Sequence, residues 1–248
     1  MTATFDGRVA LVTGAARGMG LATAERLLAL GARVAVNDVS RDQIESVAAK
    51  LGSNALAVAA DITDRAAVDA MVTKITDHFE KIDVLINNAG IVAPTAFEDI
   101  AEDEWRRVLD VNVNGTFFCS QAVAPAMKAN GYGRIVNFSS TAGKNVSTVG
   151  GASYTTSKAA VLGLTRASAK ELAPHNIPVN AVCPGMIDTD MLRVAWSEDR
   201  IQGYIPSIPL GRMGKPTEVA DLVCFLASEE AAYITGAAVD ITGGELMV

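Results

Sequence analysis

The stretch Thr13–Gly20, TGAARGMG, decides the fold of this chain of 248 residues. It lies between a short apolar run, Arg8–Thr13, and a segment of helical periodicity, Met19–Leu30. Glycines at these spacings let the backbone turn tightly and approach a pyrophosphate, while the new helix supplies N–H donors from its N-terminus. The alternative is a turn that serves only helix packing. We expect a dinucleotide to be held here by Gly14, Arg17, Gly18, Met19 and Gly20.

An acidic residue follows these glycines at the distance that suits a ribose contact. Asp38 comes directly after the second apolar run, Arg33–Asn37, and precedes Val39. A carboxylate at this place accepts hydrogen bonds from the ribose hydroxyls of NAD and repels the 2′-phosphate of NADP. Arg17 argues the other way, because a basic residue in the glycine turn could serve that phosphate. We expect NAD as the cofactor, with a helix-capping role for Asp38 as the alternative.

Short apolar runs alternate with longer helical segments along the whole chain. The predicted strands are Arg8–Thr13, Arg33–Asn37, Ala55–Ala60, Val84–Asn87, Arg134–Ser139, Pro178–Cys183 and Ala238–Ile241. The predicted helices are Met19–Leu30, Arg41–Leu51, Arg65–Phe79, Glu102–Asn130, Ser153–Ala173 and Thr217–Ala227. This alternation predicts an α/β fold, a doubly wound parallel sheet with helices on both faces, in a single domain over residues 1–248. Residues 186–215 break the rhythm and predict a substrate-binding loop or lid.

The composition excludes several classes of partner. A formal net charge of −7 and a pI of about 4.9 argue against nucleic acid and anionic membranes. Apolar runs stay below the roughly 18 residues that span a bilayer, and Met1–Gly7 lacks the features of a signal peptide. Three widely spaced cysteines are interpreted as buried, reduced thiols. We therefore expect a cytoplasmic protein with no nucleic-acid or membrane partner.

Three further motifs follow in order: Asn87-Asn88-Ala89-Gly90, Tyr154-Thr-Thr-Ser-Lys158 and Pro184-Gly185. Together with the glycine turn they resemble the short-chain dehydrogenase/reductase family, in its compact single-domain branch, over essentially the whole chain. The resemblance implies a Rossmann-type, seven-stranded sheet in a three-layer α/β/α arrangement. It also implies a homotetramer built through the long helices. It adds these residues to the expected cofactor site: Asp61, Ile62, Asn88, Ala89, Gly90, Tyr154, Lys158, Pro184, Gly185, Ile187 and Thr189.

The same resemblance implies a catalytic tetrad of Asn112, Ser140, Tyr154 and Lys158. Carbonyl reduction delivers a proton to oxygen as hydride reaches carbon, and a tyrosine of ordinary pKa is a poor acid–base group at neutral pH. Lys158 lies one helical turn beyond Tyr154, so we expect its ammonium and a cationic nicotinamide to lower the tyrosine pKa by roughly two or three units.

Two members of the tetrad have rivals or simpler explanations. Ser140 would steady the substrate oxygen, with Ser139 as the rival and a turn-forming role as the alternative for both. Asn112 would bend its helix and hold a water for proton relay, with an ordinary surface helix residue as the alternative.

These features predict an NAD-dependent oxidoreductase, an alcohol dehydrogenase or carbonyl reductase, that interconverts a small secondary alcohol, polyol or hydroxy-ketone and its ketone. The alternative is a 3-oxoacyl-[acyl-carrier-protein] reductase using NADPH, for whose acidic partner Lys128, Arg134 and Arg166 are scattered docking candidates. A dinucleotide-binding sensor is a third possibility, against which the complete tetrad argues. No metal is expected. The expected substrate pocket combines Ser140, Ala142, Val146, Tyr154, Met186, Met191 and Trp196, with the residues around Tyr204.

Overall fold

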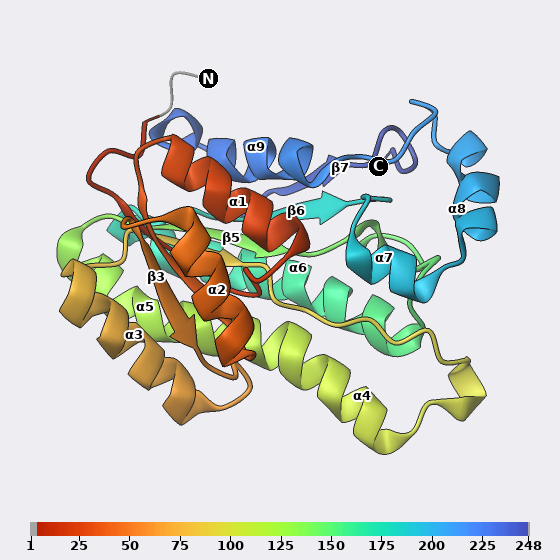
Figure 1. Ribbon diagram of the computed structural model, residues 1–248, viewed down its shortest axis with the longest axis horizontal. Helices are drawn as coiled ribbons and strands as arrows, with labels where there is room; N and C mark the ends of the chain where they lie inside the picture. The colour runs from red at the N-terminus through yellow and green to blue at the C-terminus, as the bar shows by residue number, and fades with distance from the viewer. Residues whose placement is uncertain (1–3, 248) are drawn as a thin grey trace.

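The computed structural model describes residues 4–247, and within them seven parallel strands form one sheet (Figure 1). The strand order is β3-β2-β1-β4-β5-β6-β7. The strands are β1 (Val9–Val12), β2 (Arg33–Asp38), β3 (Ala55–Ala59), β4 (Val84–Asn87), β5 (Arg134–Phe138), β6 (Val179–Pro184) and β7 (Ala238–Ile241). The order reverses at β1, because the chain first builds outward to β3 and then returns to place β4 on the other side. This confirms the expected doubly wound, Rossmann-type sheet.

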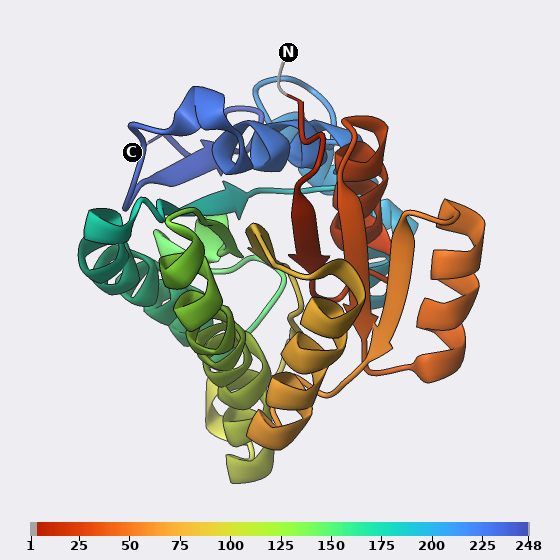
Figure 2. The ribbon, with the colours of Figure 1, turned by 90° about the vertical axis from the view of Figure 1, so that its left-hand side faces the viewer.

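Helices cover both faces of the sheet in two layers (Figure 2). One layer contains α1, α2 and α9, and the other contains α3, α5 and α6. The α-helices are α1 (Gly18–Ala29), α2 (Arg41–Leu51), α3 (Arg65–Phe79), α4 (Glu102–Leu109), α5 (Thr116–Asn130), α6 (Ala152–Leu172), α7 (Asp190–Ala195), α8 (Glu198–Tyr204) and α9 (Pro216–Ala227). Among the helices described, none is long and apolar enough to cross a membrane.

Strand β1 is buried on both sides, which explains why its sequence, VALV, is apolar without interruption. In β1, Ala10 and Val12 pack into the core beneath α1 and α9, whereas Val9 and Leu11 pack into the core beneath α3 and α5. Successive side chains of a strand point to opposite faces, so a strand between two helical layers needs apolar residues at every position.

Two segments differ from the sequence prediction. The expected long helix Glu102–Asn130 is interrupted by a π-helical turn, η2 (Asp110–Gly115). The expected irregular segment 186–215 contains the short helices α7 and α8 and a 3₁₀ turn, η5 (Ile205–Ser207). Its elements pack on a small apolar cluster of their own, separate from the two main cores. The segment is therefore a folded cap over the carboxyl end of the sheet.

Candidate active site

The glycine turn packs against the turn that follows β4. A Cβ on Gly14 would lie 2.8 Å from the Cα of Ala89, and one on Gly20 would collide with the Asn88 amide and the Gly14 carbonyl. Gly14 and Gly18 also have positive φ values of 62° and 59°, which L side chains rarely adopt. The glycines are therefore required by close approach and by backbone conformation, which explains the spacing seen in the sequence.

Hydrogen bonds join these two turns across the switch point of the sheet. The Nδ2 of Asn88 donates to the carbonyl oxygens of Thr13 and Gly14, both at 2.9 Å. The hydroxyl of Thr13 accepts from the backbone N–H groups of Asn88 and Ala89, both at 3.1 Å. Asn88 thus shapes the glycine turn, a role that its expected place near the adenosine did not include.

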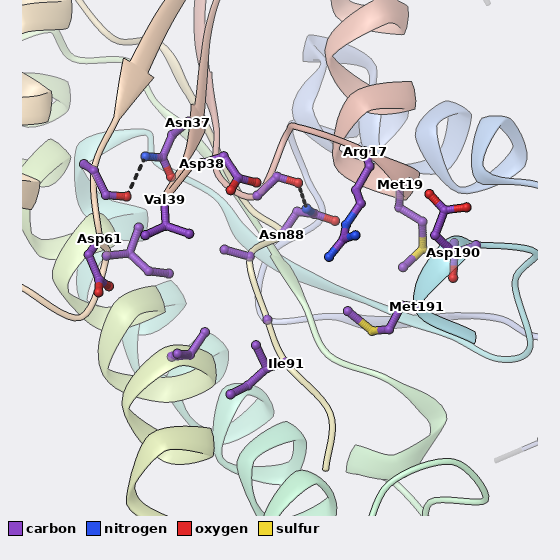
Figure 3. A pocket seen from close by; sticks show the side chains of 18 of the residues that line it. Arg17, Met19, Asn37, Asp38, Val39, Asp61, Asn88, Ile91, Asp190 and Met191 are labelled. Carbon is purple, nitrogen blue, oxygen red and sulfur yellow. Dashed lines mark hydrogen bonds between the residues drawn. The ribbon is translucent and has the colours of Figure 1, made fainter. Parts of the chain in front are cut away.

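A long cleft runs along the carboxyl ends of β1 to β4 and brings most of the expected cofactor residues together (Figure 3). Asp38 lines it from the end of β2, and its Oδ1 accepts from the N–H of Ser40 at 3.2 Å. Arg17 extends into the cleft from the start of α1. The expected residues that line this cleft are Gly14, Arg17, Gly18, Met19, Asp38, Asp61, Ile62, Asn88, Ala89, Gly90 and Thr189.

The end of the cleft beyond β3 is built by a turn and a helix. Asp61 accepts from the N–H of Thr63 at 2.9 Å and from its hydroxyl at 2.8 Å, so one carboxylate oxygen shapes the local turn. Ile62 packs on Gly115, and a Cβ on Gly115 would lie 2.5 Å from the Cδ1 of Ile62. Arg107 and Val111, which the sequence did not single out, also line the cleft.

Asn112 is buried inside the π-helical turn and ties three segments together. Its Oδ1 accepts from the N–H of Ile91 at 2.8 Å, and its Nδ2 donates to the carbonyl of Ile91 and to the hydroxyl of Ser157, both at 2.9 Å. A Cβ on Gly90 would lie 3.2 Å from this Oδ1 and 3.4 Å from Lys158 Nζ. Asn112 and Lys158 therefore converge on the turn that follows β4.

Lys158 and Tyr154 project from the first turns of α6. Lys158 Nζ donates to the carbonyl of Phe138 at 2.8 Å and lies 5.7 Å from the centre of the Tyr154 ring. Burial lowers the pKa of Lys158 from 10.5 to about 8. Burial raises the pKa of Tyr154, and a hydrogen bond with Ser140 partly opposes that effect. The expected lowering of the tyrosine pKa is therefore absent from the protein alone, because the effect of burial outweighs that of the hydrogen bond with Ser140.

The two serines after β5 have different surroundings. Ser139 is buried, and its hydroxyl donates to the carbonyl of Lys158 at 2.8 Å. Ser140 is half-buried, and its Oγ accepts from the N–H of Ala142 at 3.2 Å. Because the Ser139 hydroxyl is already used to hold α6, the geometry favours Ser140 for contact with a ligand, while its bond to Ala142 is the turn-forming role considered as the alternative.

A second cavity, which we call the chamber, adjoins the cleft and shares Met19, Thr189 and Met191 with it. Ser140, Tyr154 and Met186 line the chamber as expected of a substrate pocket. The stretch expected beside the nicotinamide, Pro184, Gly185 and Ile187, also lines it.

Three residues expected in the substrate pocket lie elsewhere. Ala142 is buried within the 3₁₀ turn η3 (Thr141–Gly143), and Val146 is 72% exposed. Trp196 packs into the cap, with its ring 5.3 Å from that of Tyr204. The sequence also missed residues that do line the chamber, among them Val149 and Glu245. Only Glu245 left a signal, as an acidic residue in an otherwise apolar C-terminal segment.

Comparisons with known proteins assign the family. A sequence model of the family described as enoyl-(acyl carrier protein) reductase matches residues 14–245. The chain is 39% identical over 244 residues to 3-oxoacyl-[acyl-carrier-protein] reductase of Escherichia coli, covering 98% of this chain and 99% of the relative. This chain belongs to the short-chain dehydrogenase/reductase family. The resemblance read from its motifs is thereby confirmed.

Other short-chain dehydrogenases/reductases give the same picture. The 3-oxoacyl-[acyl-carrier-protein] reductase of Aquifex aeolicus is 42% identical over 248 residues, covering 98% of this chain and 99% of the relative. A solved short-chain type dehydrogenase/reductase from Mycobacterium marinum superposes with a TM-score of 0.94 at 38% identity, covering 99% of this chain and 98% of that one. The family implies an oxidoreductase with a nicotinamide cofactor.

The comparisons overturn the expected reaction. Interconversion of a small secondary alcohol, polyol or hydroxy-ketone was the wrong prediction, because relatives matching nearly the whole chain are named 3-oxoacyl-[acyl-carrier-protein] reductases. They favour the reaction that the sequence offered as the alternative. The tetrad could not separate the two reactions, since both place a ketone oxygen between the same side chains. Across residues 4–247, no group of three His, Cys, Asp or Glu side chains could hold a metal ion.

Proposed function

We propose that this protein reduces the ketone of a 3-oxoacyl thioester to the 3-hydroxyacyl thioester with a reduced nicotinamide cofactor. The observation that carries the proposal is the chamber lined by Ser140 and Tyr154, which adjoins the cleft where most of the expected dinucleotide-binding residues gather. The names of relatives at about 40% identity over nearly the whole chain supply the substrate class.

The raised pKa of Tyr154 suits the direction of reduction. A phenol that stays protonated at neutral pH can donate its proton to the C3 oxygen, and Ser140 can donate a hydrogen bond to the same oxygen. The bound cofactor would supply the hydride to C3. With a pKa of about 8, Lys158 is mostly an ammonium at neutral pH and stabilises the phenolate that remains. Asn112 holds the Ile91 backbone and Ser157 in place around these groups.

For the cofactor we propose NADH rather than NADPH, on the chemistry of the cleft. The Asp38 carboxylate lines the ribose end, and the next side chain, Val39, is 71% exposed and offers no positive charge. A 2′-phosphate beside this carboxylate would meet like charge at close range. Arg17 reaches the same cleft and is the competing attraction for a phosphate.

The reaction is tested with N-acetylcysteamine thioesters and the purified protein. We expect acetoacetyl-N-acetylcysteamine to be reduced, and Tyr154→Phe to lower kcat by at least about a hundredfold while cofactor binding, followed by NADH fluorescence, persists. The crotonyl thioester tests the enoyl reduction suggested by the description of the family model. Reduction of the crotonyl but not the acetoacetyl thioester, or an active Tyr154→Phe variant, would contradict the proposal.

The cofactor is tested separately by comparing kcat/KM for NADH and NADPH. We expect the wild-type protein to prefer NADH by about tenfold or more, and Asp38→Asn to reduce that preference. Asp42→Asn, an exposed position on α2 with the same charge change, is the matched control and should leave the ratio unchanged. A wild-type preference for NADPH would overturn the cofactor assignment but not the reaction.

The acyl carrier and the assembly are further parts of the proposal. Arg134 cannot serve as a docking residue because it is buried against Tyr132 and donates to the Gly133 carbonyl. Lys128 and Arg166 are exposed, so reduction of acetoacetyl-acyl-carrier protein should weaken with salt if they contribute. We further propose a homotetramer, which would cover an apolar stripe on α4, η2 and α5. Analytical ultracentrifugation would detect the tetramer by its mass. The stripe has helical spacing and comprises Trp105, Leu109, Val113 and Phe117.

A further inference from the structure

The chamber contains a carboxylate that the proposed mechanism does not use. Among its described lining residues, Glu245 is the only Asp, Glu, Lys or Arg. The rest of that wall is largely apolar, with Val149, Met186 and Leu192 around it. A charge among apolar groups acts more strongly on a neighbouring charge than it would in water.

Backbone geometry carries Glu245 back from the end of the sheet into the chamber. Gly243 and Gly244, just after β7, have φ values of 64° and 90°, which reverse the chain. The carbonyl of Gly243 accepts from the N–H of Leu210 at 3.0 Å, which fixes this C-terminal segment to the cap. Figure 1 shows the end of the chain on the same side of the molecule as α7 and α8.

Two donors hold the carboxylate in a fixed position. The hydroxyl of Tyr204 donates to Oε1 at 2.6 Å, and the N–H of Met186 donates to Oε2 at 3.2 Å. A Cβ on Gly185 would lie 2.5 Å from Oε2, so the absence of a side chain at Gly185 makes room for the acid. Both oxygens accept hydrogen bonds, as the ionised form does.

The charge of Glu245 is not neutralised by a base. Within residues 4–247, no Lys, Arg or His lies within ion-pair distance of Glu245, although eleven other ion pairs are present. Its two partners, a phenol and an amide, are neutral donors. Glu245 therefore contributes an unpaired negative charge to the lining of the chamber that also contains Ser140 and Tyr154, whereas Lys158 is not part of that lining.

We propose that Glu245 determines substrate specificity by excluding the free 3-oxo acids into which 3-oxoacyl thioesters hydrolyse. This inference rests on the proposed function. In the thioester the acyl carbon C1, two carbons from the reacting ketone carbon C3, carries no charge. In the free acid the same carbon belongs to a carboxylate. The two molecules are nearly alike at the reacting carbon, so like-charge repulsion from Glu245 is the feature that separates them.

The test uses two small ketones that differ in charge but hardly in size, acetoacetamide and acetoacetate. For the wild-type protein we expect kcat/KM for the amide to exceed that for the acid by about tenfold or more. Glu245→Gln removes the charge but keeps one acceptor oxygen for the Met186 N–H, and its amide N–H can donate to the Tyr204 hydroxyl. This variant should reduce the ratio at least about fivefold, chiefly by raising the rate with acetoacetate. The control is Glu171→Gln, the same charge change at an exposed position at the end of α6 that does not line the chamber.

A second variant separates charge from structure. Tyr204→Phe removes a donor but keeps the carboxylate, so the preference for the amide should persist at or above the wild-type ratio. The inference is overturned by an unchanged ratio in Glu245→Gln, by a wild-type protein that treats both ketones alike, or by loss of both activities in Glu245→Gln, which would make the residue structural. Failure of the proposed function is distinguishable, because acetoacetyl-N-acetylcysteamine would then not be reduced.

Discussion

Replacing Lys158 by methionine should remove a pH dependence from the free energy of unfolding. Lys158 is only 5% exposed, and burial lowers its pKa from 10.5 to about 8. Between these values the unfolded chain still holds a proton that the folded protein has released, so stability rises with pH in that window. Below about pH 8 the folded protein carries a buried ammonium and bears the full cost, about 3 kcal/mol for a difference of this size.

The assay is urea unfolding of both proteins at a fixed concentration, repeated from about pH 7 to about pH 9.5. Over this range the wild-type protein should gain about 2 kcal/mol relative to Lys158→Met. The variant also loses the hydrogen bond to the Phe138 carbonyl, but that loss shifts its curve uniformly and does not change its slope. Tyr154 has a raised pKa and titrates above the window.

Lys170→Met, at an exposed position of the same helix, controls for the loss of any lysine and should run parallel to the wild-type curve. If the wild-type and Lys158→Met curves are also parallel, the ammonium is not significantly desolvated. The account of Lys158 as a buried ammonium whose pKa is lowered by the loss of solvent would then be refuted.

Two other expectations follow from close packing. Gly20→Ala should destabilise the protein by about 1 to 3 kcal/mol and weaken cofactor binding, because the new Cβ would collide with Asn88. Gly203→Ala is the control, since no atom lies within 4 Å of its new Cβ, and it should change neither property. Urea unfolding measures the stability of both variants, and NADH fluorescence measures cofactor binding. Burial raises the pKa of all three thiols, so a thiol reagent at about pH 8 should label the native protein far more slowly than the unfolded one, and fast labelling would contradict their burial. The pKa values rise to about 12, 11 and 12 for Cys119, Cys183 and Cys224.

The sheet and the cofactor cleft were predictable because they depend on local signals. The short, largely apolar runs predicted every strand to within a residue or two, as expected of strands that are covered on both faces. The glycines of the first turn were recognisable because Gly14 lies too close to Ala89 for a side chain, and Gly14 and Gly18 both have positive φ values. Parallel strands then bring their carboxyl ends to one edge, which is how Asp38 and Asp61 come to share a cleft.

The parts that failed depend on tertiary contacts or on chemistry that the motifs share. The π-helical turn η2 around Asn112 is held by partners from other segments, Ile91 and Ser157, so helical periodicity in the sequence does not reveal it. Glu245 reaches the chamber only through the two left-handed glycines before it. Trp196 packs into the apolar core of the cap and not against the substrate pocket. The positions of apolar residues in the sequence alone could not distinguish these two places.

The π-helical turn η2 between α4 and α5 also makes the number of residues between these two helices intolerant of change. A regular α-helix advances by about 100° per residue, so deleting one residue from Asp110–Gly115 would rotate everything on one side of the cut by more than a quarter of a revolution. Asn112 would swing off the Ile91 backbone, or the outward stripe that begins at Trp105 would lose its alignment. The interior amide and the outer stripe therefore depend on the same spacing, and a single-residue deletion here would sacrifice one of them to keep the other.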